Sequence, residues 1–143
     1  MPRKKTWKLA PPHGYIARAR SFAGAARILN EHQKSDFIPY LFCCGQATEV
    51  ALKAFLVLKA VDESTFLRNP GHDLIKGWGL AVSHRAPIPS TPPQWCTLIN
   101  VQHIAPFNSR YPRANNLMGL PDARVALDGI DSLIETIEKE ITK

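Results

Sequence analysis

Apolar residues recur along most of this chain at steps of three and four, which is the period of an α-helix and not of a strand. One such run extends from Tyr15 to Asn30, and a longer one extends from Phe37 to Val61. A third begins at Asp73 and a fourth follows Pro121. No stretch alternates apolar and polar residues over the length of a strand, and no internal repeat is visible. The pattern predicts an all-α domain.

The run from Phe37 to Val61 is apolar on two sides, so this helix is expected to lie buried between neighbours. Ser35 or Asp36 is expected to cap its start by accepting a hydrogen bond from a first-turn amide. Pro39 supports this boundary, because proline is tolerated in the first turn of a helix.

The stretch from Ala86 to Pro121 is rich in proline and is expected to be irregular, apart from a short apolar helix from Gln94 to Ile104. We therefore predict an antiparallel bundle of four main helices, with this Pro-rich irregular excursion before the last one. The apolar seams expected to face the core are Ile16, Ala19, Ala23, Ala26 and Ile28 or Leu29 in the first helix, and Val125, Leu127, Ile130, Leu133, Ile134, Ile137 and Ile141 in the last.

The composition fits one globular domain over residues 1–143, because 45% of the 143 residues are hydrophobic and 21% are charged. Residues 1–12 are expected to form a basic tail that contains Arg3, Lys4, Lys5 and Lys8. With 18 Lys and Arg against 12 Asp and Glu, the formal charge is +6, which favours an anionic partner without identifying it.

The three cysteines are Cys43, Cys44 and Cys96, and they form no CxxC pair and no zinc-type spacing with histidine. The sequence therefore predicts no metal and no cofactor, and a reducing cytoplasmic location. The N-terminus lacks the apolar core of a signal peptide. No membrane contact is expected, because Glu49 and Lys53 interrupt the longest apolar stretch.

Gln46, Glu49 and Lys53 make a polar strip on the longest predicted helix, because steps of three and four bring side chains to one face. Glu49 and Lys53 are one turn apart, with the acid first, and can form an ion pair. On a buried helix each charge needs a partner. The strip is therefore either a structural ion pair or the wall of a polar pocket.

His72 follows Pro70 and Gly71 and precedes Asp73 at the predicted start of a helix. Backbone amides at such a start are available to an anion, and phosphate is the natural candidate. The alternative is that His72 only caps the helix or pins the loop.

The stretch Ala47-Thr48-Glu49-Val50-Ala51-Leu52-Lys53-Ala54-Phe55-Leu56, followed by Gly71-His72-Asp73-Leu74, resembles the HEPN family of helical bundles. Many members belong to toxin–antitoxin, phage-defence and RNA-processing systems. The later Arg110-Tyr111-Pro112 also looks like a segment of compact bacterial members. The resemblance is strongest from Phe37 to His84.

This resemblance implies two functions. Some HEPN proteins are metal-independent ribonucleases that use an arginine and a histidine in an R-x4-6-H motif across a dimer, and others bind nucleotides or partner nucleotidyltransferases. Here Arg68 and His72 are separated by only three residues. Arg27 and His32 have the four-residue gap but lie in the first helix, whereas the family motif lies late in the bundle.

The leading hypothesis is a homodimeric HEPN-like module that binds a nucleotide, RNA or a nucleotidyltransferase partner without catalysis. The alternatives are a metal-independent ribonuclease, in which His72 would be the base and Lys53, Arg110 or Arg113 a phosphate-stabilising cation, and a purely structural dimerisation domain. Trp78 is expected to be a core residue. The predicted ligand-binding residues are Glu49, Lys53, His72, Asp73, Arg110, Tyr111 and Arg113.

Overall fold

The computed structural model describes residues 10–32, 37–62, 65–66, 71–104 and 120–143. Its helices are α1 (Pro12–His32), α2 (Ile38–Leu58), α4 (Leu74–Ser83), α5 (Gln94–His103) and α7 (Ala123–Ile141). The described ranges contain helices and turns but no strand, so the predicted all-α bundle is confirmed. The basic residues of the tail and Arg110, Tyr111 and Arg113 lie outside the described residues.

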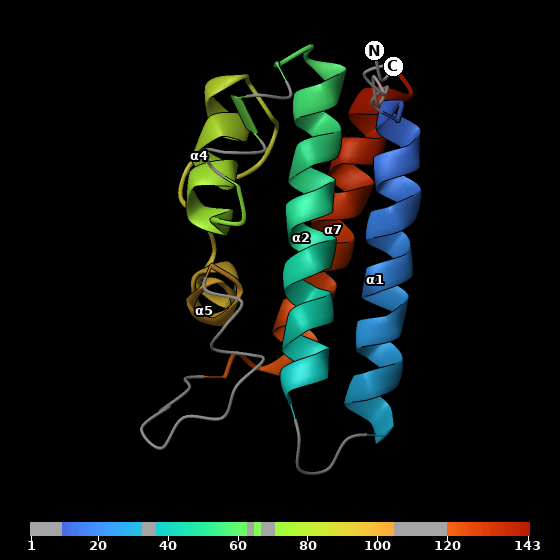
Figure 1. Cartoon of the computed structure of the whole chain (residues 1–143), viewed down its shortest axis with the longest axis vertical. Helices are drawn as coiled ribbons and strands as arrows, with labels where there is room; N and C mark the ends of the chain where they lie inside the picture. Colours follow the sequence, from blue (N-terminus) through green and yellow to red (C-terminus); the bar gives the residue numbers. More distant parts are fainter. Residues whose placement is uncertain (1–9, 33–36, 63–64, 67–70, 105–119) are drawn as a thin grey trace, which may run out of the picture.

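Within the described residues, three long helices and two short ones form a bundle (Figure 1). Helices α1, α2 and α7 lie side by side, and α1 runs opposite to the other two. The short helices α4 and α5 lie on the other side of α2, and α5 is turned across the long axis (Figure 1). Because α2 packs against α1, α4, α5 and α7, it is the centre of the described part of the fold.

Helix α2 begins one residue later than predicted. Phe37 occupies the N-cap position without a side-chain capping hydrogen bond, and Pro39 stands in the first turn. The helix is therefore not capped as expected, and Ser35 and Asp36 lie outside the described residues. Thirteen of its residues are buried, including Glu49 and Lys53, which confirms that it lies between neighbours.

Length and composition alone would allow α2 to span a membrane, although Glu49 and Lys53 interrupt its apolar sequence. The two charged residues Glu49 and Lys53 do not lower the mean hydropathy of α2 below the value typical of a membrane-spanning helix. In the folded chain 67% of the most apolar 18-residue stretch of α2 is buried, as in the core helix of a bundle.

The packing faces of α1 and α7 agree with the predicted seams, with one choice resolved and one exception. Small residues of α1, such as Ala19 and Ala23, let the long helices approach closely. Leu29 packs against the core, whereas Ile28 is 61% exposed. Val125 is 58% exposed, because it lies in the first turn of α7 and off the face that carries the rest of the seam.

The Pro-rich loop between α4 and α5 is held by the two tryptophans that flank it. Trp78 is buried as predicted, and its indole Nε1 donates to the Pro89 carbonyl over 2.7 Å. Trp95 packs edge-on against Trp78, with ring centroids 6.4 Å apart. These contacts fix where α5 starts, and hence where its last residue, His103, meets α2.

Candidate functional site

Glu49 lies in the middle of α2, where its side chain is only 9% exposed. Lys53, one turn later, donates from Nζ to Glu49 Oε2 over 2.8 Å and is 11% exposed. The i, i+4 spacing brings the two side chains together on one face, as predicted. The pair is thus a buried ion pair, and its acid has one more oxygen to satisfy.

His72 reaches that second oxygen from the turn before α4. Gly71 has φ 57°, a left-handed conformation that glycine adopts without a steric penalty. This turn directs His72 back to α2, where its Nδ1 lies 2.8 Å from Glu49 Oε1. The His72 side chain is 57% exposed, so it connects the buried acid to solvent.

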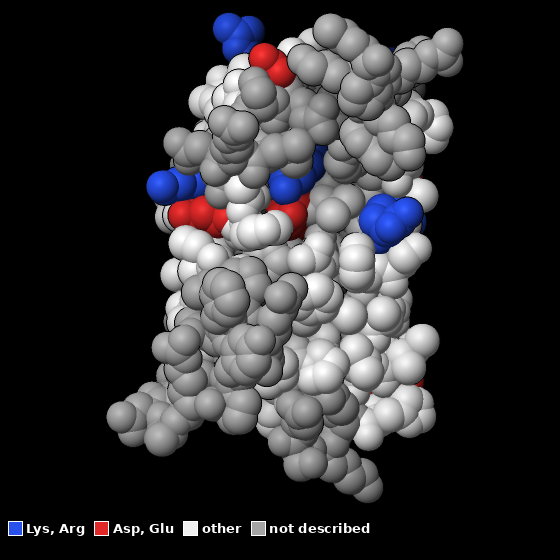
Figure 2. All heavy atoms as spheres, in the orientation of Figure 1, with Lys and Arg blue, Asp and Glu red and all other residues white. Residues whose placement is uncertain are grey.

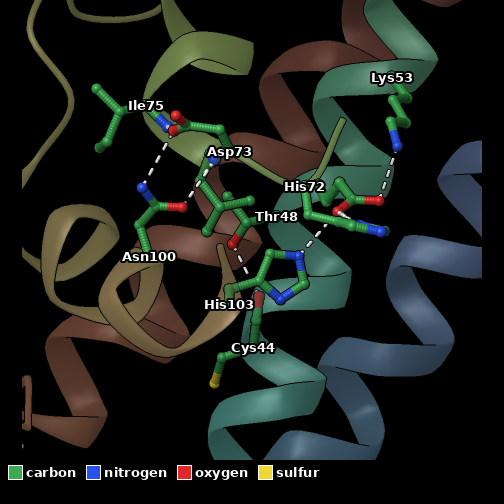
Figure 3. Close-up of polar contacts among 10 residues, drawn as sticks. Cys44, Thr48, Lys53, His72, Asp73, Ile75, Asn100 and His103 are labelled. Carbon is green, nitrogen blue, oxygen red and sulfur yellow. Dashed lines mark hydrogen bonds and ion pairs between the residues drawn. The ribbon is translucent and has the colours of Figure 1, made fainter. Parts of the chain in front are cut away.

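His103, the last residue of α5, is the functional candidate that sequence reasoning missed. Its Nε2 also lies 2.8 Å from Glu49 Oε1, and its side chain is 4% exposed. The ring occupies the space beside Gly45, where an added Cβ would be 2.3 Å from Nδ1. Lys53, His72 and His103 therefore converge from three elements on one place beside α2 (Figure 3).

Three donors keep Glu49 ionised. Burial raises the pKa of this carboxyl group, but hydrogen bonds from His103, Lys53 and His72, together with the charge of Lys53, lower it to about 2. A carboxylate has no proton to donate, so both contacting ring nitrogens carry the hydrogen. His72 is thus held in the tautomer that carries its proton on Nδ1.

Asp73 and Asn100 fix the start of α4, directly after His72. Asp73 Oδ1 accepts hydrogen bonds from the amides of Ile75 and Lys76 over 3.0 and 3.2 Å. Asn100 Oδ1 accepts from the amide of Leu74 over 2.8 Å, and its Nδ2 donates to Asp73 Oδ1 over 3.1 Å. Figure 3 shows Asp73 and Asn100 in contact with each other next to the histidines.

This network corrects the expected anion site at the start of α4. The first-turn amides of Leu74, Ile75 and Lys76 are bonded to the side chains of Asn100 and Asp73 and are not available to a phosphate. The Asp73 carboxylate acts as the helix cap, a role that its place at the positive helix end favours. A ligand would have to be held by side chains.

Charged side chains of both signs lie across the middle and at the top of the face shown in Figure 2, and the described part of its lower half is mostly uncharged. This face shows no continuous basic surface among the residues that the structure describes. The described Lys and Arg side chains therefore form no broad anion-binding surface on this face.

Arg27, which with His32 matches the ribonuclease spacing, takes part in a contact between helices. Arg27 forms ion pairs with Asp131 and Asp128 of α7, and the hydrogen bond to Asp131 raises the pKa of its guanidinium. Arg27 therefore joins α1 to α7. Arg68, of the shorter match with His72, lies outside the described residues.

The cluster of Lys53, His72, His103 and Glu49 is equipped for two kinds of chemistry. It can donate hydrogen bonds to an anion from the Lys53 ammonium and, when the His72 ring is protonated, from His72 Nε2. It can also hold a metal ion, because one oxygen of Glu49 and one nitrogen of each histidine lie within 4.8 Å of one another. No metal was expected from the sequence, because the cysteines form no CxxC pair and no zinc-type spacing with histidine. Glu49, His72 and His103 are far apart along the chain and show no such local spacing.

Comparison with protein-family models, with curated proteins and with solved structures finds no significant match. The HEPN resemblance and the homodimer therefore stay predictions.

Proposed function

We propose that this chain is a HEPN-like binding module that holds the phosphate of a nucleotide or RNA with His72 and Lys53. The observation that carries the proposal is the contact of 2.8 Å between His72 Nδ1 and Glu49 Oε1. It joins the two segments on which the HEPN resemblance rests, although 23 positions separate these residues. A fixed histidine that is 57% exposed is placed to receive a ligand.

The four side chains of the cluster have different roles because they differ in burial. Glu49 and His103 are almost fully buried and position the other two side chains. Lys53 uses one of the three N–H donors of its ammonium on Glu49, and His72 turns Nε2 away from that carboxylate. When protonated, His72 offers a second charged donor to phosphate, and charged hydrogen bonds of this kind are the strong ones.

The test is binding of a short single-stranded RNA and of ATP in the presence of EDTA, measured by fluorescence anisotropy and calorimetry. His72→Ala should weaken binding at least about tenfold and leave the helical circular dichroism spectrum unchanged. His84→Ala is the matched control, because His84 is another exposed histidine, at the opposite end of α4. Equal affinity of wild type, His72→Ala and His84→Ala for RNA and ATP would contradict the proposal. Unfolding of His72→Ala would show that the cluster is purely structural.

A metal-independent ribonuclease is the second candidate, and one observation favours it. Because Glu49 binds Nδ1 of His72, the neutral ring holds its lone pair on Nε2, which is the nitrogen that can take a proton from a ribose 2′-OH. RNA digestion in EDTA with wild type, His72→Ala and Arg110→Ala separates the candidates. The binding module predicts no cleavage by any of them, and the ribonuclease predicts that wild type cleaves and both variants fail.

A further inference from the structure

Glu49 Oε1, His72 Nδ1 and His103 Nε2 form a three-point cluster whose members come from α2, from the turn before α4 and from the end of α5. Each nitrogen is 2.8 Å from the same oxygen, and the three atoms lie within 4.8 Å of one another. Ligand atoms around a tetrahedral zinc ion are about 3.3 Å apart when the bonds are about 2.0 Å long. Side-chain shifts of about an ångström would therefore make room for the ion.

From this geometry we propose that Glu49, His72 and His103 bind a divalent transition metal of the zinc class, with the fourth position open to solvent beside His72. Two imidazoles and one carboxylate suit zinc, whereas magnesium and calcium prefer oxygen ligands alone. Three protein ligands and one open position are typical of zinc sites that bind a further ligand. The proposal goes beyond phosphate binding, since the metal needs no nucleotide.

Two of the three ligands are already held in place. Glu49 is 9% exposed and ionised, and the His103 ring is confined beside Gly45. The third, His72, is 57% exposed and can close over the ion. On binding, each ring moves the proton that faces Glu49 Oε1 to its other nitrogen, so neutral rings release no net proton.

The proposal predicts that removing the Lys53 ammonium has opposite effects on metal binding and on phosphate binding. Its ammonium holds Glu49 Oε2 over 2.8 Å, so only Oε1 is left for a metal. A cation on the same carboxylate also repels a metal ion. Lys53→Met should therefore strengthen metal binding, whereas the same substitution should weaken phosphate binding.

The experiment is a Zn²⁺ titration of the untagged full chain without nucleotide, in competition with a chromogenic chelator, supported by the visible spectrum of the Co²⁺ form. Wild type should bind one equivalent. His72→Ala should lose at least about tenfold in affinity, Lys53→Met should gain, and His84→Ala should match wild type. Because phosphate binding is measured separately in EDTA, failure of one proposal is distinguishable from failure of the other.

Three results would overturn the metal site. The first is the absence of stoichiometric binding by wild type. The second is an affinity that His72→Ala leaves unchanged. The third is a thiolate-to-cobalt charge-transfer band, which would place the metal at Cys43, Cys44 or Cys96.

Discussion

His103 lies so close to Gly45 that a Cβ added to the glycine would be 2.3 Å from Nδ1 and 2.7 Å from Cγ of the imidazole. Gly45 is one turn before Glu49 on α2, so the missing side chain makes the space in which the histidine reaches the carboxylate. The absence of a side chain at one position thus decides whether α5 can contribute to the site.

Gly45→Ala should destabilise the fold by about 1–3 kcal/mol, because the methyl group displaces a buried ring from a packed interior. Gly24→Ala is the matched control, since a Cβ there meets nothing within 4 Å and alanine favours a helix by up to about 1 kcal/mol over glycine. Urea unfolding followed by circular dichroism measures both. Equal stability of the two variants would mean that His103 does not pack against α2.

The stability of the metal-free protein should fall in acid because of Glu49. The pKa of this group is lowered from 4.5 to about 2 in the folded chain. Its contribution is therefore fully present above pH 4.5 and is lost as the pH falls towards 2. The shift corresponds to about 3 kcal/mol.

Glu49→Gln should flatten that acid dependence, and at neutral pH it should be less stable than wild type because Lys53 loses its buried counter-ion. Guanidinium unfolding in EDTA at a series of pH values provides the comparison. Parallel curves for the two proteins would show that the carboxylate is not held by its three donors.

Variants of Asp73 test whether this residue acts as the cap of α4 or contacts the ligand directly. Asp73→Ala should cost about 1 kcal/mol of stability through the lost N-cap. It should also weaken phosphate binding, because the turn that carries His72 loosens. Asp122→Ala removes the N-cap of α7, away from the cluster, and should cost a similar stability without changing affinity.

Asp73→Asn keeps an oxygen acceptor for the Ile75 and Lys76 amides and should retain both stability and affinity. The readouts are thermal unfolding and RNA anisotropy. If Asp73→Asn loses as much affinity as Asp73→Ala, the charge of Asp73 and not its cap is what the ligand senses.

Arg27 provides a negative prediction for the ribonuclease spacing in α1. Arg27→Ala removes exposed ion pairs to Asp131 and Asp128 and should cost no more than about 1 kcal/mol. It should leave RNA binding and any RNA cleavage unchanged in gel-based and anisotropy assays. A loss of either activity would reinstate Arg27 and His32 as functional residues.

The parts of this structure that local patterns encode were predictable from sequence. The period of three and four predicted the helices, and the i, i+4 spacing predicted the Glu49 and Lys53 pair. The Pro70-Gly71 sequence before a predicted helix indicated His72 as a candidate. Val125 was predicted to be part of the apolar seam of α7 but is exposed. The residues along the rest of the helix decide which face is buried, and Val125 in the first turn lies off that face.

His103 and Asn100 could not be found in the same way. His103 meets Glu49 across 54 positions, and Asn100 meets Asp73 across 27, so no local period encodes either contact. Two signals were present in hindsight. Gly45 lies within the long central helix one turn before Glu49, where it leaves space for another side chain. Asn100 and His103 have the three-residue spacing that places polar groups on one face of α5.

The central claim is that Glu49 holds His72 through Nδ1 and leaves Nε2 for a ligand. A two-bond ¹H–¹⁵N correlation spectrum of the histidine side chains, recorded in EDTA at a pH where His72 is neutral and assigned with His72→Ala, tests it most directly. We predict a proton on Nδ1 of His72 in the free protein and protonation of its Nε2 when inorganic phosphate is added, because only an N–H can donate to the phosphate. A His72 ring that carries its proton on Nε2 and ignores phosphate would contradict the account.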